Sequence, residues 1–292
     1  MKIDEFRVPF NKKISLSEFS TNTTAKIEHK KDAEKLLKKN IKKMAELQDK
    51  LYAHDKYGLL LMFQAMDAAG KDGGIKHVMS GLNPQGTQVY SFKQPSTEEL
   101  DHDYLWRINK SLPERGRIGI FNRSYYEEVL VVRLYNLLEK QKLPDDVRTD
   151  DVWERRFRQI CDYERYLYEN AIRSVKFFLH LSKDEQKKRF LRRIDDPTRN
   201  WKFSASDLKE RQQWDNYQRL YSEALSATST KYSPWYVIPA DNKWFARLLI
   251  SEVVIHHLEE LKPEYPKMPE EQVKNLASYR EALMSEDEKP KK

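Results

Sequence analysis

Five short apolar runs alternate along the chain with longer stretches in which apolar residues recur at helical spacing. Short apolar runs bounded by polar residues are typical of buried strands. Strands that alternate with helices favour βαβ crossovers and a parallel sheet flanked by helices. The sequence therefore predicts an α/β fold with a five-stranded parallel sheet. The predicted strands are 57–63, 87–92, 117–122, 174–181 and 235–240.

The predicted helices lie mainly between these runs. From Lys31 to Leu51, apolar residues recur every three or four positions among lysines, which predicts an amphipathic helix. Residues 151–154 have the spacing of a capping box and predict the start of a second helix. Ser182 is expected to cap a third helix, and 204–226 is predicted to be one further helix.

The same pattern predicts one α/β domain with an appendage at each end. Residues 1–55 are expected to form an arm, extended to about residue 30, and then the first helix. The α/β domain is predicted to span 56–262. The tail 263–292 is rich in proline and charge, so we expect it to pack as part of the same unit or to be partly disordered.

Charge narrows the range of partners. The chain has 53 Lys and Arg against 46 Asp and Glu, a formal net charge of +7, which favours anionic partners such as nucleic acid, phosphorylated metabolites or an anionic polymer.

A single cysteine, Cys161, excludes an internal disulfide and a cysteine-based zinc site. The start of the sequence is too polar for a signal peptide, and the apolar runs are too short to span a bilayer. We therefore expect a cytoplasmic protein.

The first predicted strand leads into a loop suited to holding phosphate, within LLLMFQAMDAAGKDGGIKHV (59–78). Such a loop needs glycine at a sharp strand-to-helix turn, backbone N–H groups at the helix start and a lysine, here Lys71. The match to G-x-x-x-x-G-K-[ST] is incomplete, because Ala65 replaces the first glycine and Asp72 replaces the hydroxyl residue. The alternative is a glycine-rich turn whose acids cap the following helix.

Asp67 is unexpected in a phosphate loop. Phosphates would repel this carboxylate unless a cation lay between them, and Mg²⁺ would remove the conflict. Alternatively, Asp67 accepts a proton from an incoming phosphate oxygen or aligns it. Asp72 follows the lysine at the helix start, where a carboxylate offsets the helix dipole.

A second group of polar residues follows the strand at 117–122. Ligands of open α/β sheets bind at the carboxyl ends of strands, where Asn122 and Arg123 lie. Arg123 could hold a phosphate bidentately. Glu127 and Glu128 fall in the first turn of the next helix, so a role as dipole partners and a role in binding metal or substrate both stay open.

A third group lies in the predicted helix after Ser182. Arg189, Arg192 and Arg193 have the spacing that places three guanidinium groups on one helical face. The alternative is a solvated basic face with a Glu185–Arg189 ion pair. The chain breaks at Asp196-Pro197 before another helix, so 184–211 is predicted to form a helical hairpin that closes over a site.

Six segments carry a further signal: AMDAAGKDG (65–73), SFKQPSTEELDHDYLWR (91–107), GIFNRSYYEEVLVVR (119–133), QKKRFLRRIDDP (186–197), NWKFSASD (200–207) and PWYVIPADNKWFARL (234–248). Taken in order, they resemble the polyphosphate kinase 2 family over roughly residues 30–260. This resemblance implies a thymidylate-kinase-like phosphate-loop kinase fold, with 184–211 as a helical lid. It also implies reversible transfer of the terminal phosphoryl group of inorganic polyphosphate to nucleoside mono- and diphosphates, with Mg²⁺ or Mn²⁺.

The resemblance also implies roles for individual residues. Asn122 stands where many members have aspartate, and it resembles the branch that accepts both mono- and diphosphates. The implied catalytic residues are Asp67, Lys71, Asn122, Arg123 and Glu127, with Asp67 and Glu127 as metal ligands. The implied nucleotide- and polyphosphate-binding residues are Ala68, Ala69, Gly70, Asp72, Gly73, Lys76, Lys93, Arg133, Arg189, Arg193 and Lys202.

The implied partners are polyphosphate, the purine nucleotides AMP, ADP and ATP with GMP, GDP and GTP as further candidates, and a second or further copies in a homodimer or homotetramer. No nucleic acid or membrane partner is implied. The sequence departs from the family pattern at Leu134-Tyr135-Asn136, where a Val-His pair is expected, and this bears on nucleotide preference.

The sequence leaves three other functions to compare. The nearest is an ATP-dependent nucleotide kinase of the same fold. A nucleic-acid-binding module is disfavoured, because no binding motif appears and many aromatic residues fall in apolar runs. A metal hydrolase at His256-His257 is also disfavoured, since adjacent helical residues are expected to point in different directions.

Overall fold

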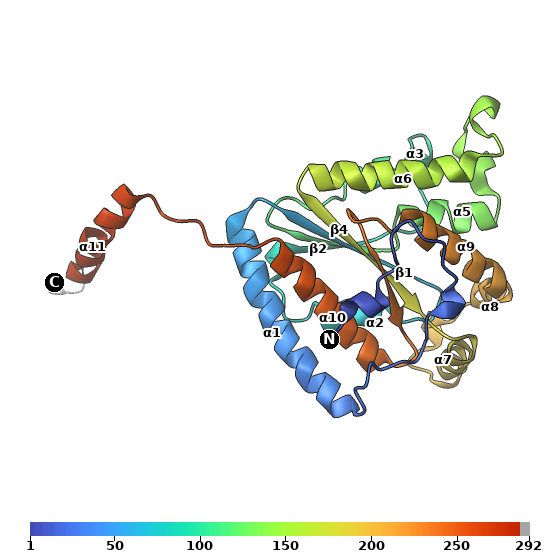
Figure 1. Cartoon of the computed structure of the whole chain (residues 1–292), viewed down its shortest axis with the longest axis horizontal. Helices are drawn as coiled ribbons and strands as arrows, with labels where there is room; N and C mark the ends of the chain where they lie inside the picture. The colour runs from blue at the N-terminus through green and yellow to red at the C-terminus, as the bar shows by residue number, and fades with distance from the viewer. Residues whose placement is uncertain (287–292) are drawn as a thin grey trace.

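A computed structural model describes residues 1–286 (Figure 1). Its five strands are all parallel and lie in the order β2-β3-β1-β4-β5. Each predicted apolar run overlaps one of these strands, although β1 ends two residues later and β4 begins two residues earlier than predicted, so the predicted α/β fold is confirmed. The strands are β1 Gly58–Ala65, β2 Thr87–Ser91, β3 Ile118–Asn122, β4 Ile172–His180 and β5 Trp235–Pro239.

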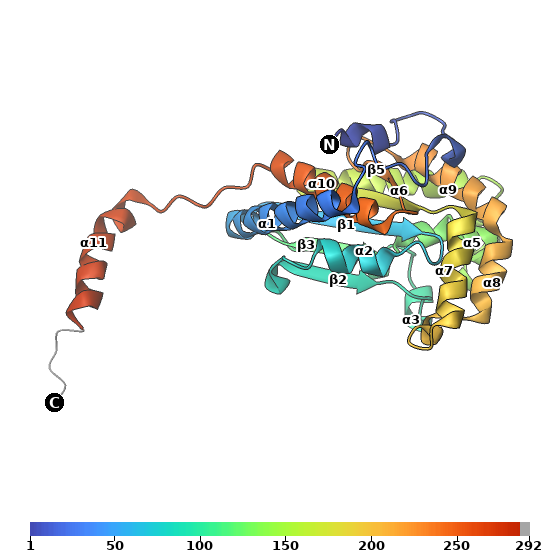
Figure 2. The ribbon, with the colours of Figure 1, turned by 90° about the horizontal axis from the view of Figure 1, so that it is seen from below.

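Helices cover both faces of the sheet (Figure 2). Successive residues of a strand point to opposite faces. Leu59, Leu61 and Phe63 of β1 therefore pack on one side with α1, α2 and α10, whereas Leu60 and Met62 pack on the other with α6 and α9. The α-helices are α1 Lys30–His54, α2 Lys71–Val78, α3 Thr97–Leu100, α4 Trp106–Asn109, α5 Val131–Leu134, α6 Val152–Glu169, α7 Lys183–Asp195, α8 Ala205–Gln212, α9 Trp214–Thr228, α10 Lys243–Glu260 and α11 Glu270–Ser285.

The register of β1 and β3 brings two loops together. Phe63 of β1 pairs with Asn122 of β3, and the N–H of Arg123 donates to the carbonyl of Phe63 at 3.0 Å. The glycine-rich loop after β1 and the Asn122-Arg123 pair after β3 therefore leave the same edge of the sheet side by side.

Three local predictions are corrected. Asp151 is the N-cap of α6, which confirms the predicted helix start, but the capping-box bond is absent and its carboxylate accepts from the Thr149 hydroxyl instead. The helix predicted at 204–226 is two helices, α8 and α9, separated at Gln213. The arm before α1 is not simply extended, since it contains two 3₁₀ turns, η1 Ile3–Phe6 and η2 Leu16–Glu18. The predicted cap of α7 is confirmed: the N–H of Glu185 donates to Ser182 Oγ at 3.1 Å.

The two ends of the chain behave differently. The N-terminal arm is tied to the last strand, since the N–H of Val8 donates to the carbonyl of Trp235 at 2.9 Å. Helix α11 projects away from the rest of the molecule, and its residues are exposed (Figures 1 and 2). Among the described helices, none combines the length and apolar character needed to span a membrane.

Candidate active site

The loop between β1 and α2 has the geometry of an anion-binding turn. Gly70 precedes α2 with φ +102°, in the left-handed region that favours glycine. Helix α2 begins at Lys71, so its first N–H groups have no partner within the helix and border the cavity beside the loop. No side chain caps α2, which rules out the alternative that the acids of this loop serve as caps.

A cavity of about 1030 Å³ lies over this loop. Residues of the loop, of α7 and the turn after it, and of the first part of α10 form its walls. Ten basic side chains line it against two acidic ones, Asp67 and Asp72. The basic residues are Lys71, Lys93, Arg123, Arg189, Arg192, Arg193, Arg199, Lys202, Lys243 and Arg247.

A second cavity of about 410 Å³ adjoins the first. The two cavities share four residues, Phe92, Lys93, Gln94 and Arg123, and therefore meet at these side chains. The second cavity is much less basic and includes several apolar and aromatic side chains. These are Phe92, Leu100, Tyr104, Tyr125, Val131, Val132 and Leu137.

Arg123 stands between two predicted metal ligands at this junction. Its guanidinium lies 3.6 Å from a carboxylate oxygen of Asp67 and 3.6 Å from one of Glu127. Its φ of +66° is a strained conformation for a residue with a side chain. The nearby Glu127 carboxylate raises the pKa of Arg123. The arrangement thus holds two carboxylates around one permanent cation.

Glu127 is also anchored to the sheet. The side-chain amide of Gln64, assigned by its hydrogen-bond network, donates to Glu127 Oε1 at 3.0 Å and accepts from Ser124. Burial raises the pKa of Glu127, while the charges of Arg123 and Lys71 oppose that change. Gln64 was not identified from the sequence, because it stands inside an apolar strand.

Lys71 belongs to the same group of charges. Burial lowers its pKa, as does the Arg123 cation, whereas Asp67 and Glu127 act in the opposite direction. None of the hydrogen bonds or ion pairs found among residues 1–286 engages its ammonium group. Its three N–H donors are therefore available to an anion in the large cavity.

Asn122 and Asp72 contact each other across the site. The Asn122 amide donates to an Asp72 carboxylate oxygen at 2.6 Å, which links the end of β3 to the first turn of α2. Asp72 therefore has a second structural contact besides its predicted place near the positive end of the helix dipole. Both side chains line the large cavity.

The guanidinium group of Arg189 does not share an exposed helical face with those of Arg192 and Arg193. All five of its N–H groups are engaged: Nε donates to Glu185, Nη1 to the carbonyls of Ala68 and Ala69, and Nη2 to those of Ala240 and Asp241. Only 5% of its side chain is exposed. The prediction that one helical face presents all three guanidinium groups is therefore wrong for Arg189. Its side chain turns inward and holds the phosphate loop through the carbonyls of Ala68 and Ala69.

The lid segment, residues 184–211, forms the far wall of the large cavity. Arg193 donates to the carbonyl of Lys202 at 3.1 Å and lies 3.5 Å from Asp207. Arg193 and Lys202 both line the cavity, in agreement with their predicted placement. These contacts join α7 to the start of α8, so the predicted helical hairpin is present.

Two predicted binding residues lie elsewhere. Lys76 is exposed on α2 and lines neither cavity. Arg133 also lies outside both linings, where it pairs with Glu223 at 2.6 Å. This geometry gives no support to a phosphate contact by either residue.

Three cavity cations were missed from the sequence: Arg199, Lys243 and Arg247. The last two fall within PWYVIPADNKWFARL, a segment already recognised as similar to the family, but no role was assigned to them. The position of Lys243 and Arg247 after the fifth strand could have indicated a place in the site, because residues that follow parallel strands lie at the same edge of the sheet as the phosphate loop.

The histidine pair at the end of α10 also differs from expectation. His256 and His257 both approach Glu260, at 3.5 and 2.8 Å, so the rings do not point fully apart. Among the described residues this is the one group of three side chains with potential ligand atoms within 4.8 Å of one another. Lys243, at the other end of α10, lines the large cavity, and 14 residues of helix separate it from His257 by roughly 21 Å.

Comparison with known proteins gives consistent results. The family model described as Polyphosphate kinase 2 matches residues 26–266. An ADP-polyphosphate phosphotransferase of Rhodopseudomonas palustris is 50% identical over 97% of this chain and 99% of that protein. An AMP/ADP-polyphosphate phosphotransferase of Meiothermus ruber is 43% identical over 90% of this chain and 95% of that protein. The crystal structure of polyphosphate kinase 2 from Arthrobacter aurescens TC1 matches with a TM-score of 0.88 and 38% identity, over 97% of this chain and 96% of that one.

Proposed function

We propose a function from one premise: the chain belongs to the polyphosphate kinase 2 family. The chain transfers the terminal phosphoryl group of inorganic polyphosphate to a nucleoside mono- or diphosphate, in a reversible reaction. The observation that carries this proposal is the large cavity with ten basic side chains against two acidic ones. A polymer with about one negative charge per phosphate suits such a surface, because phosphates beyond the reacting one can each contact further basic side chains.

The two cavities suggest how donor and acceptor are arranged. Polyphosphate occupies the large basic cavity over the loop, and the nucleoside occupies the smaller cavity with its aromatic and apolar walls. The reacting phosphates then meet where the cavities join, at Arg123 and Lys93. The ten basic side chains of the large cavity support a long polyanion as the donor in preference to ATP.

The side chains at the junction supply alignment and charge neutralisation. Lys71, the N–H groups at the start of α2 and Arg123 stabilise the negative charge on the transferring phosphoryl group. Asp67 borders the same space and aligns the incoming phosphate oxygen, or accepts a proton from it. The lid excludes water from the phosphates once it closes over them.

We propose Mg²⁺, or Mn²⁺ in its place, as the metal that Asp67 and Glu127 bind together with the substrate phosphates. Mg²⁺ sites in phosphoryl-transfer enzymes use one or two carboxylates and complete the shell with substrate phosphates. Asp67 and Glu127 provide hard oxygen ligands on either side of Arg123, at 3.6 Å from its nitrogens, longer than a normal hydrogen bond. A bound Mg²⁺ would neutralise charge on the phosphate oxygens during transfer.

The acceptors we propose are AMP and ADP, with their guanosine counterparts. Asn122 supports the use of both mono- and diphosphates, through its likeness to the branch that accepts them. The two relatives differ in their names, ADP for one and AMP/ADP for the other, so AMP is the informative substrate. A cytoplasmic homodimer or homotetramer completes the proposal.

The direct test incubates the purified protein with Mg²⁺, polyphosphate and either AMP or ADP, and resolves the nucleotides by chromatography. We expect ADP and ATP from AMP, and ATP from ADP. ATP from ADP alone would overturn the dual acceptor. Activity only when ATP replaces polyphosphate would overturn the donor and favour an ATP-dependent nucleotide kinase. Removing Mg²⁺ with a chelator should abolish the reaction.

Raising the pH is expected to weaken polyphosphate binding through Lys243. Partial burial, followed by the nearby guanidinium of Arg189, lowers the pKa of this lysine to about 8. Its amine is cationic below that pH and neutral above it, so its attraction for a polyanion declines as the pH rises. At constant ionic strength, the KM for polyphosphate should rise from about pH 7 to about pH 9, and it should rise less in Lys243→Met. Parallel profiles for the two proteins would contradict this prediction.

A further inference from the structure

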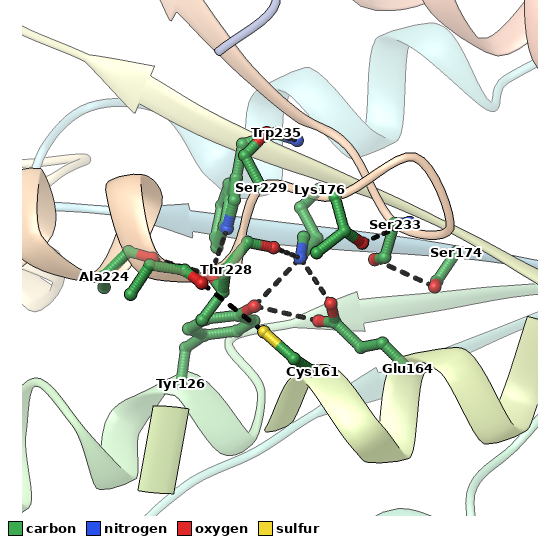
Figure 3. Close-up of polar contacts among 12 residues, drawn as sticks. Tyr126, Cys161, Glu164, Ser174, Lys176, Ala224, Thr228, Ser229, Ser233 and Trp235 are labelled. Carbon is green, nitrogen blue, oxygen red and sulfur yellow. Dashed lines mark hydrogen bonds and ion pairs between the residues drawn. The ribbon is translucent and has the colours of Figure 1, made fainter. Parts of the chain in front are cut away.

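A fully buried ion pair lies behind the site, between α6 and β4 (Figure 3). Lys176 Nζ is 2.6 Å from Glu164 Oε2, and neither side chain has any exposed surface. The function proposed above gives these two residues no direct contact with substrate, since neither lines either cavity.

Every donor in this cluster has a partner. Lys176 uses its three N–H groups on Glu164, on the Tyr126 hydroxyl at 2.9 Å and on the Thr228 carbonyl at 2.7 Å. Glu164 Oε1 accepts from the Tyr125 and Tyr126 hydroxyls, both at 2.8 Å. The network is therefore closed, and its contacts converge on one carboxylate.

Stability alone is a weak explanation for this cluster. Taking two charges out of water is costly, and replacing a buried ion pair with well-packed apolar residues is often neutral or stabilising. The charged carboxylate instead fixes where the two tyrosine side chains point, because both hydroxyls donate to the same oxygen of Glu164. Tyr125 and Tyr126 also lie immediately before Glu127, and both are fully or nearly fully buried.

These tyrosines belong to one short turn that carries site residues. The 3₁₀ helix η4, Tyr125–Glu128, follows Arg123 and Ser124 directly. Glu127 faces Arg123 at 3.6 Å, whereas the phenols reach Glu164. The position of Glu127 therefore depends on how its two preceding side chains are held.

Helix α6 braces the same turn a second time. Arg156 donates to Glu128 at 3.0 Å, and Gln141 donates to Glu128 at 2.7 Å. Arg156 and Glu164 are eight residues apart on α6, about two turns, so they lie on nearly the same face of the helix. One rigid helix thus contacts η4 at both of its ends.

We propose that Glu164, neutralised by Lys176, is a positioning residue for the reaction: by fixing the hydroxyls of Tyr125 and Tyr126 it sets Glu127 and Arg123 at the junction of the two cavities. The inference rests on the proposed function, which assigns Arg123 to the reacting phosphates and Glu127 to the metal beside them. Glu164 and Lys176 act through η4 and not by contact with substrate, and Tyr125 is the one member of the cluster that borders a cavity.

The test removes the two hydroxyls and keeps the rings, in the double variant Tyr125→Phe/Tyr126→Phe. We expect kcat to fall at least about 10-fold, with the KM for polyphosphate within about twofold of the wild type, because only alignment at the junction changes. Tyr236→Phe is the matched control, since it removes a phenol of β5 that contacts His257 of α10, and it should leave kcat unchanged. Each assay is run below the onset of thermal unfolding of the variant.

A second variant guards against a simple loss of folding. Glu164→Gln/Lys176→Met removes both charges together, so no unpaired buried charge remains. The introduced amide can still accept from a phenol but lacks the charge, and kcat should lie between those of the wild type and the tyrosine variant. An unchanged kcat in both variants overturns the proposal, as does a loss of kcat that merely follows the unfolded fraction. The assay uses whichever donor the wild type accepts, so a wrong donor assignment would show in the wild type and not be confused with a failure of this proposal.

Discussion

Lys71→Met is expected to lower kcat about 10²- to 10³-fold, which is the range seen when one preorganised donor to a developing anion is removed. The Lys71 ammonium has no partner among the described side chains, so its loss breaks no internal contact. Burial lowers its pKa, which means that the folded protein holds this charge at a cost. The midpoint of thermal unfolding should therefore not fall.

The experiment measures initial rates with polyphosphate and ADP together with thermal unfolding. Lys76→Met is the matched control, because Lys76 lies on the same helix but borders neither cavity, and it should retain wild-type activity. A Lys71→Met protein that keeps its activity would remove the phosphate loop from the mechanism. A marked loss in Lys76→Met would show that the cationic track extends along α2, as the sequence first indicated.

Arg189→Met is expected to reduce both stability and activity. The substitution leaves four backbone carbonyls without their donor, two in the phosphate loop and two after β5. Buried acceptors left unsatisfied next to a lost charge cost roughly 3 kcal/mol of unfolding free energy. The phosphate loop would also lose the hydrogen bonds through which Arg189 links it to the segment before α10. Because this would misalign the loop, kcat should fall by at least about tenfold.

Arg189→Lys separates bracing from phosphate binding. Lysine keeps the charge but has three donors in place of a planar fork of five, so it cannot restore all five contacts. If Arg189 braces the loop, this variant should also unfold at lower denaturant concentration than the wild type. Arg192→Met is the comparison, because Arg192 is an exposed cavity cation on the same helix, and here only the KM for polyphosphate should rise. Wild-type stability in Arg189→Met would contradict the bracing role.

The sequence by itself determined the sheet and the place of the site. The apolar runs are local signals, and each of them overlaps a strand of the sheet. The positive φ of Gly70 and the helix start at Lys71 are also local, because they depend on a residue type and its immediate neighbours. Parallel strands align their carboxyl ends, so the sequence already predicts Asn122 and Arg123 beside the loop, and the register of β1 and β3 places them there.

Only the tertiary structure decided where the long side chains point. Helical spacing put Arg189 with Arg192 and Arg193, but packing turned its guanidinium toward carbonyls about 50 and 120 residues away in sequence. The Glu164 cluster likewise joins α6, β4 and η4 through contacts that no periodicity encodes. Backbone pattern follows from local sequence, whereas the partner of a flexible charged side chain is set by which distant segments fold against it.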